Sequence, residues 1–253
     1  MPLTYGGLVG AAVLLALAGA WVNTRARFVI APGRLVDVLL LALLAGLIGA
    51  RAVHVGLHWA YFQDHPAEIL RLQAGGLAWH GAVAGALAGL WAGWRWWLTR
   101  TPGAIYPLLG AAAVALPLIG FAGWWGCWHV HCAYGAEVAT LADHPGWLVW
   151  EARDLTGDIV PRYAVQPVGM AASAVILAGV LLAGRRGWSA RRRLGLALLL
   201  TAGSLFALGF LRGDPVAAWL GLRADQWLDG LLAAWGALLL LLPAAPAPAR
   251  TLS

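Results

Sequence analysis

The sequence has no lysine at all, and it is poor in charge of either sign. Its 253 residues include 17 basic side chains, all of them arginine, and 11 acidic ones, so 11% are charged, against about 25% in ordinary soluble domains. The arginines are spread between long apolar runs, which argues against a nucleic-acid partner. With 61% hydrophobic residues and a mean hydropathy of +0.75, the composition excludes a disordered chain and an ordinary soluble enzyme. It indicates a polytopic helical membrane protein.

Cysteine is almost as scarce as lysine. The two residues present, Cys127 and Cys132, are too few for a disulfide scaffold. They flank His129 and His131, and two thiols with two imidazoles could together hold a metal ion. The order C-x-H-x-H-C lacks the usual C-x2-C and H-x3-H spacings, so we expect no metal here, although this alternative stays open. We also expect no cofactor elsewhere in the chain.

Long apolar runs predict an all-α polytopic membrane protein with seven transmembrane helices. Because a span needs about 20 residues, we place the spans at roughly 5–23, 35–58, 76–98, 104–123, 164–183, 193–211 and 226–243. The whole chain, 1–253, is expected to form one transmembrane domain. The start MPLTYGG lacks a basic region, which predicts a retained span and no cleaved signal peptide. The Pro/Ala-rich tail 243–253 is expected to be unstructured.

The distribution of charge between the connections predicts the orientation of these helices. Most of the arginines lie in the first, third and fifth connections and in the tail, whereas nearly all acidic residues lie in the others. Since basic residues mark cytoplasmic loops, we expect the N-terminus outside and the C-terminus in the cytoplasm. The longest connection, 124–163, then lies outside after span four. Its content of tryptophan, histidine and acid predicts a small external cap.

Polar side chains in or beside the apolar runs are costly in a bilayer, and they are therefore candidate functional residues. Arg51 could bind a lipid phosphate or snorkel to the interface. His80 could act as a base or hydrogen-bond a neighbouring helix. Gln166 could bind a headgroup or begin an interfacial helix, and Arg212 could bind phosphate or pair with Asp214 in a turn. All lie near the expected outer ends, which predicts a cavity for an anionic lipid headgroup.

In their order along the chain, these motifs resemble the phosphatidylglycerol–prolipoprotein diacylglyceryl transferase family. The matching stretches are IGARAVHV, GGLAWHGAVAG, GWWGCWHVHCAYG, RYAVQP, and GFLRGDP followed by LGLRADQWL. They extend from about residue 34 to residue 241. The resemblance implies an enzyme of the bacterial plasma (inner) membrane, with seven spans and an external cap. Such an enzyme transfers diacylglyceryl from phosphatidylglycerol to the lipobox cysteine of a prolipoprotein and releases glycerol phosphate.

The resemblance also implies roles for individual residues. His80 takes the catalytic position, where it assists deprotonation of the thiol that the substrate protein supplies. The residues implied to bind the phospholipid are Arg51, Gly81, Gly126, Gly135, Gln166, Arg212 and Asp214. The implied partners are an anionic phospholipid and a prolipoprotein signal peptide, or other membrane subunits.

Several positions depart from the family pattern. Neutral residues replace charged or polar residues of the family at Trp124, Cys127, Val168, Gly169, Ser204 and Gly209. A phosphate-binding arginine that becomes tryptophan loses its charge and its five donors. Two functions therefore stay open. One is a transferase that works through Arg51, His80 and Arg212, with Arg153 or Arg162 of the cap as further cations. The other is a catalytically inactive paralogue that serves as a lipid-binding or scaffold subunit of a membrane complex.

Overall fold

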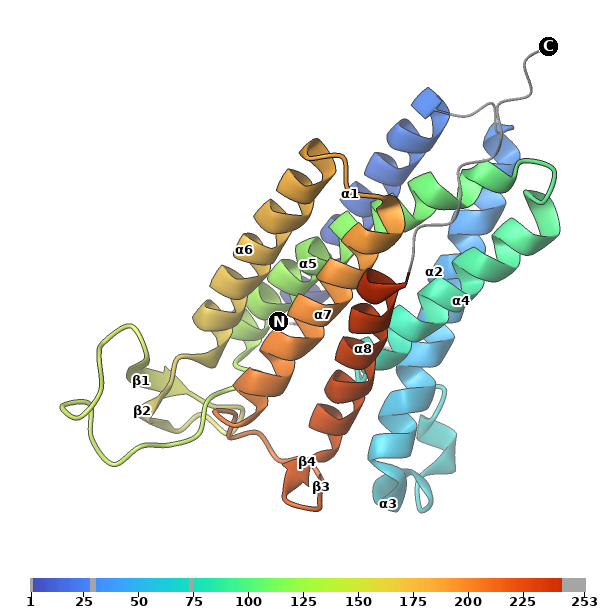
Figure 1. Ribbon diagram of the computed structural model, residues 1–253. Helices are drawn as coiled ribbons and strands as arrows, with labels where there is room; N and C mark the ends of the chain where they lie inside the picture. The colour runs from blue at the N-terminus through green and yellow to red at the C-terminus, as the bar shows by residue number, and fades with distance from the viewer. Residues whose placement is uncertain (1, 28–30, 73–74, 243–253) are drawn as a thin grey trace, which may run out of the picture.

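The computed structural model describes residues 2–27, 31–72 and 75–242 (Figure 1). Within these ranges the chain is mostly helical, as predicted. The α-helices are α1 (Pro2–Arg27), α2 (Pro32–Leu57), α3 (Trp59–Phe62), α4 (Trp79–Trp97), α5 (Ile105–Val130), α6 (Val165–Arg185), α7 (Ala190–Gly209) and α8 (Ala224–Leu241). Short 3-10 helices occupy Pro66–Glu68 and Pro102–Ala104. The predicted unstructured tail, 243–253, lies outside the described residues.

Five of the helices, α1, α2, α5, α6 and α7, are long and apolar enough to cross a membrane. They match five of the seven predicted spans. The other two predicted spans coincide with α4 and α8, which have 19 and 18 residues. Tryptophans in α4 and two aspartates in α8 make these helices less apolar than the others.

Helix α5 does not stop at 123, where the sequence predicted the end of the fourth span. It continues to Val130 because Trp124 and Gly126 face the protein interior and nothing in this segment breaks a helix. The helix ends at His131, which adopts a left-handed conformation with φ 59°, a common way to terminate a helix. The predicted cap at 124–163 therefore begins with two turns of α5, and its non-helical part starts at His131.

The non-helical part of the cap contains an antiparallel hairpin, which the sequence did not predict. Strand β1 (Val149–Arg153) pairs with β2 (Ile159–Tyr163). In the turn between them, Oδ1 of Asp154 accepts hydrogen bonds from the backbone N–H groups of Thr156, Gly157 and Asp158. The Thr156 hydroxyl and these amides lower the pKa of Asp154. Oδ2 accepts from Arg162 at 2.7 Å, so Arg162 pairs within the cap.

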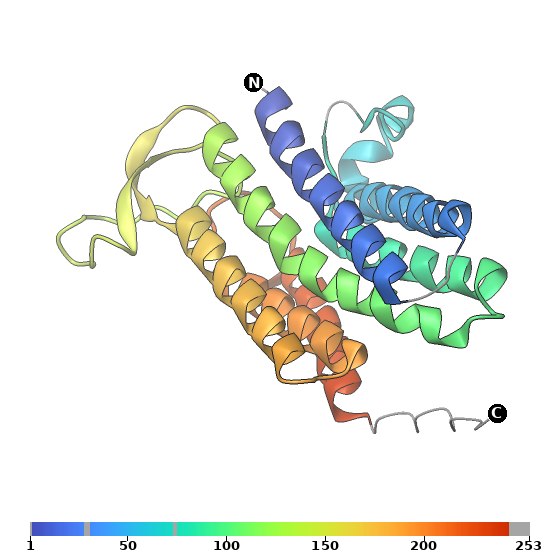
Figure 2. The same cartoon turned by 90° about the horizontal axis from the view of Figure 1, so that it is seen from above.

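Helix packing divides into two groups, which share a buried apolar cluster at the end opposite the cap, where Leu35, Leu98 and Leu108 meet. Helix α5 packs against α1, α6 and α7, and α7 packs against α8, whereas α2 packs mainly against α4 (Figure 2). The α2–α4 contact is backbone to backbone, because a Cβ atom on Gly49 or on Gly81 would collide with the other residue's carbonyl oxygen. Gly81 therefore holds α4 against α2. A second short hairpin, β3 (Ala218–Trp219) and β4 (Leu222–Arg223), precedes α8.

Candidate functional site

Candidate residues from four different segments lie at one end of the bundle. Arg51 is in the last turns of α2, His80 opens α4, Gln166 opens α6, and Arg212 follows α7. In Figure 1 these helix ends, the β1–β2 hairpin and the β3–β4 hairpin all gather at the bottom of the view. The α4–α5 and α6–α7 connections lie at the opposite end, and arginines cluster in them and in the helix turns that adjoin them. The alternating direction of the helices is what brings the candidates together.

The guanidinium of Arg51 is buried, and it binds the connection that leads into α4. It donates to four backbone carbonyl oxygens at 2.6–2.9 Å, those of Glu68, Ile69, Gly75 and Gly76. Both glycines have positive φ, +82° and +72°, a conformation that glycine adopts without cost. Four of the five N–H donors of Arg51 are therefore used inside the protein, and its main effect is to hold the segment before His80 in place.

His80 forms a buried pair with Asp229 of α8. Its Nε2 lies 2.8 Å from Oδ1 of Asp229, and the two residues are 7% and 3% exposed. The other ring nitrogen, Nδ1, is also buried and has no hydrogen-bond partner within the described part of the chain. A histidine whose one nitrogen is held by a carboxylate and whose other nitrogen is unengaged can accept a proton from a substrate.

Asp229, the buried partner of His80, was not predicted as a candidate from the sequence. It lies within α8. Its signal in the sequence was its spacing from Asp225, because residues four apart share one face of a helix. Two carboxylates on one face of an otherwise apolar helix mark a polar site.

Arg212 belongs to a cluster of two arginines and two aspartates. Its Nε donates to Asp214 at 2.7 Å and its Nη1 to Asp225 at 3.1 Å. Arg223 donates to the same two carboxylates at 3.1–3.2 Å. Burial alone would lower the pKa of Arg212, but the hydrogen bonds and charge of Asp214 outweigh it, and the pKa is raised. The cluster is neutral overall, and it includes the Arg212–Asp214 pair that the sequence had left open.

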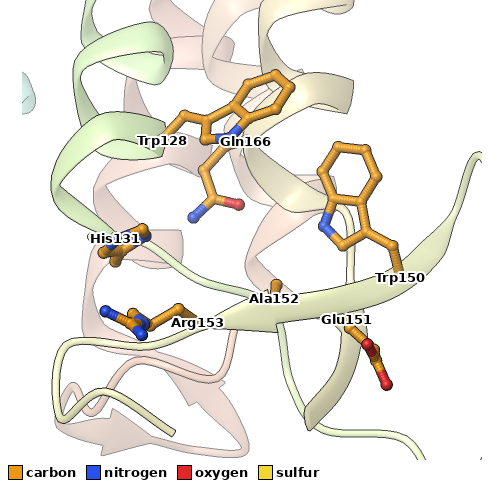
Figure 3. Close-up of a pocket in the computed structure, with 7 residues that line it drawn as sticks. All are labelled: Trp128, His131, Trp150, Glu151, Ala152, Arg153 and Gln166. Carbon is orange, nitrogen blue, oxygen red and sulfur yellow. The ribbon is translucent and has the colours of Figure 1, made fainter. Parts of the chain in front are cut away.

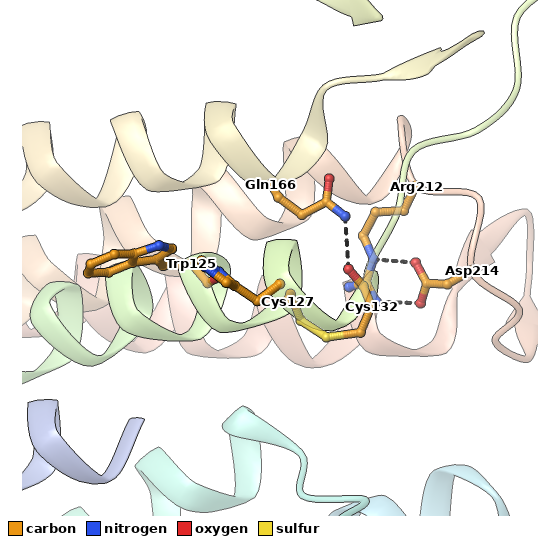
Figure 4. The surroundings of a disulfide bond; sticks show 7 residues. Trp125, Cys127, Cys132, Gln166, Arg212 and Asp214 are labelled. Carbon is orange, nitrogen blue, oxygen red and sulfur yellow. Dashed lines mark hydrogen bonds and ion pairs between the residues drawn. A yellow bond between two sulfur atoms is a disulfide. The ribbon is translucent and has the colours of Figure 1, made fainter. Parts of the chain in front are cut away.

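Cys127 and Cys132 form a disulfide across the end of α5 (Figure 4). Nε2 of Gln166 donates to the carbonyl oxygen of Cys132 at 3.0 Å, so the disulfide turn is tied to the start of α6. Because both sulfurs are bonded to each other, the alternative of a metal held by these cysteines with His129 and His131 is wrong. Within the described ranges, no group of three or more histidine, cysteine or acidic side chains could hold a metal ion.

At the two remaining candidate glycines, Gly126 and Gly135, a neighbouring group lies so close to the backbone that a side chain would not fit. A Cβ atom on Gly126 would meet the ring of Tyr5 in α1, and one on Gly135 would collide with the carbonyl oxygen of Tyr163. Gly135 also forms an isolated β-bridge with Arg212. The backbone of the cap therefore positions the turn that carries the ion cluster.

Three positions that depart from the family pattern are filled by neighbouring side chains. The buried indole of Trp124 lies against Gly169, where any Cβ atom would collide with it. Val165 and Leu208 complete this apolar cluster. At Gly209 a side chain would meet Gln226, whose Cγ would be 2.7 Å from the added Cβ. Apolar groups and an amide thus occupy the places where the resembled family carries charge.

The fold and the site together define a class: a helical protein with membrane-spanning features and a polar centre at one end. That centre combines an imidazole–carboxylate pair with a neutral arginine–aspartate cluster, and a disulfide-linked cap covers one side of it.

The chain belongs to the prolipoprotein diacylglyceryl transferase family, whose profile matches residues 3–242. It is similar to the phosphatidylglycerol–prolipoprotein diacylglyceryl transferase of Bacillus cytotoxicus, with 39% identity over 85 residues. The enzyme of the same name from Bacillus velezensis is 37% identical over 84 residues. Each match covers 33% of this chain and 30% or 31% of the relative. The family membership predicted from the motifs is therefore confirmed.

Proposed function

We propose that the chain is a prolipoprotein diacylglyceryl transferase of the bacterial plasma membrane. Its donor would be phosphatidylglycerol, an anionic phospholipid, and its acceptor the lipobox cysteine behind a prolipoprotein signal peptide. The observation that carries the proposal is the buried His80–Asp229 pair with its unengaged ring nitrogen. The pair lies in the first turns of α4 and α8, at the same end of the bundle as the last turns of α2 with Arg51 and the end of α7 before Arg212 (Figure 1).

The chemistry needs a base and a stabilised leaving group. The cysteine sulfur forms a bond to the glyceryl carbon while the bond from that carbon to the phosphate oxygen breaks, so glycerol phosphate leaves with the electron pair. We assign the thiol proton to Nδ1 of His80, because the thiolate is the reactive form of cysteine. Asp229, bonded to Nε2, is a positioning residue that holds the ring and stabilises its protonated form.

The anionic headgroup would lie beside the two arginines. Arg212 uses three of its donors on Asp214 and Asp225, which leaves two N–H groups, and Arg51 keeps one. Asp214 orients Arg212, and Gln166 orients the disulfide turn. Gly81, Gly126 and Gly135 contribute by letting backbones approach closely. These residues form the proposed phospholipid site.

We further propose seven spans, formed by α1, α2, α4, α5, α6, α7 and α8, with the N-terminus outside and the C-terminus in the cytoplasm. Two features support this orientation. Basic residues concentrate at the end of the bundle opposite the cap. Disulfides persist in oxidising compartments, so the Cys127–Cys132 bond supports a cap outside the cytoplasm.

The orientation predicts how thiols react in intact cells. After treatment with a membrane-impermeant reductant, we expect a membrane-impermeant maleimide to label Cys127 and Cys132 without permeabilisation. As a control, Ser189→Cys in a background of Cys127→Ser and Cys132→Ser lies in the α6–α7 connection. It is expected to react only after permeabilisation. The reverse pattern would contradict the proposed orientation.

A purified-component assay tests the transfer itself. The protein is incubated with phosphatidylglycerol and a lipobox peptide, and the products are measured by mass spectrometry. We expect the peptide to gain one diacylglyceryl group and an equal amount of glycerol phosphate to appear. His80→Gln is expected to slow the formation of both products by about 10²–10⁴-fold. Absence of product with folded wild-type protein would overturn the proposal.

A second candidate function is favoured by the apolar cluster around Trp124. That cluster fills positions where family members carry charge, which suits a catalytically inactive lipid-binding or scaffold subunit of a membrane complex. The same assay separates the two. Selective binding of phosphatidylglycerol without any transfer would support this second function.

A further inference from the structure

A cavity of about 300 Å³ lies between the end of α5, strand β1 and the start of α6 (Figure 3). Neither α4 nor α8 contributes a lining residue, so the cavity is separate from the His80–Asp229 pair. Its volume is at the small end of the range for small-molecule sites. It can hold a headgroup-sized ligand but has no room for acyl chains.

One side of the cavity carries hydrogen-bond donors that bind no other group of the described residues. The guanidinium of Arg153 and the ring of His131 point to the same region below Gln166 in Figure 3. Neither side chain makes a hydrogen bond or ion pair with any part of the chain that the structure describes. A free guanidinium beside an imidazole N–H is an arrangement suited to a phosphate group.

The other side of the cavity offers flat apolar faces and an acceptor. The rings of Trp128 and Trp150 have centroids 5.5 Å apart and are tilted by 43°. Nε2 of Gln166 is used on the carbonyl of Cys132, which leaves Oε1 to accept a hydroxyl. Indole faces pack against C–H groups while their N–H groups stay available to polar atoms. Glu151 points away from Arg153 and His131 (Figure 3), so its carboxylate does not oppose an anion there.

We propose that this cavity binds the phosphate ester of a short polyol, with Arg153 and His131 on the phosphate and with Gln166 and the two indoles on the polyol. The proposal rests on the proposed function, because the donor lipid and the released product would both carry glycerol phosphate. The disulfide contributes to the site, since it closes the turn that carries Trp128 and His131. The site would hold the leaving group near the cap, either on the lipid or after release.

Binding measurements on the full-length protein test this assignment. In nanodiscs of neutral phosphatidylcholine, glycerol 1-phosphate is titrated and followed by calorimetry and by indole fluorescence. A second arm compares the indole fluorescence of the protein in nanodiscs with phosphatidylglycerol and in nanodiscs without it. We expect saturable binding in at least one arm, which Arg153→Gln weakens by about tenfold or more, the loss expected for one charge-assisted hydrogen bond. Binding in the first arm identifies the released ester as a ligand, and binding in the second arm alone identifies the lipid headgroup.

The matched control is Arg100→Gln, which removes an exposed arginine at the opposite end of the bundle and is expected to bind like the wild type. Arg153 is exposed, so its variant should fold, and thermal unfolding checks this. No binding in either arm, or equal affinity of Arg153→Gln and wild type, overturns the proposal. The binding measurement does not require the enzyme to turn over. Ligand binding without diacylglyceryl transfer would therefore overturn only the proposed function, and transfer without ligand binding would overturn only this site.

Discussion

Replacing Asp229 with asparagine is expected to slow diacylglyceryl transfer by about 10²–10⁴-fold, the contribution of a positioned acid–base group. The amide has the size of the carboxylate but carries no charge. Its N–H can donate to Nε2 of His80, and the ring would then carry its proton on Nδ1. That tautomer cannot accept the thiol proton. The rate of product formation is measured by mass spectrometry, and thermal unfolding is followed in parallel.

The control for this prediction is Asp143→Asn, which neutralises an exposed aspartate of the cap and should leave the rate unchanged. His80→Gln and the double variant with Asp229→Asn are measured beside it. If the two residues act as one unit, the double variant is no slower than His80→Gln alone. A wild-type rate in Asp229→Asn would remove the pair from the mechanism. A rate loss that follows the loss of folded protein would assign Asp229 a structural role.

Arg212→Gln is expected to lower the free energy of unfolding by about 3 kcal/mol, the lower end of the range for breaking a buried ion pair. The lower end applies because the side chains of the cluster are still 12–19% exposed. Without Arg212, Arg223 faces the carboxylates of Asp214 and Asp225 alone. The measurement is denaturant unfolding of the purified protein in detergent, followed by tryptophan fluorescence.

Two further variants separate this effect from the loss of any arginine. Arg71→Gln breaks an exposed pair with Glu68 and should cost no more than about 1 kcal/mol. Adding Asp214→Asn to Arg212→Gln restores the charge balance, and the coupling between contacting residues should return about 1 kcal/mol or more. If Arg212→Gln were as mild as Arg71→Gln, the cluster would not stabilise this end of the bundle.

Much of the helical layout could be predicted from apolar runs alone. The C-terminal end of α5 and the cap hairpin could not, because they depend on local backbone geometry at His131 and on the turn held by Asp154. The sequence predicted that the candidate residues share one end of the bundle, and the structure shows this. It did not predict which groups these residues bind. Arg51 is bound by backbone carbonyl oxygens, and backbone groups have no signature in a sequence.

The cysteines illustrate a choice that spacing leaves open. Two thiols and two imidazoles in one short segment left a metal site open as an alternative, and their spacing alone did not predict a disulfide. Only the left-handed turn after Val130 brings Cys127 and Cys132 to a Cα separation of 4.6 Å. That separation suits a disulfide.

Composition and motifs were enough to predict the class of the protein, its family and the placement of most helices. Long apolar runs must be buried as helices because lipid cannot satisfy free backbone groups, and the ordered motifs identify the family. Which polar groups meet depends on how the helices pack. His80 and Asp229 are 149 residues apart, and their contact depends on how α4 approaches α8. That approach is set by interhelical packing, for example at Gly49 and Gly81, and hydropathy does not encode it.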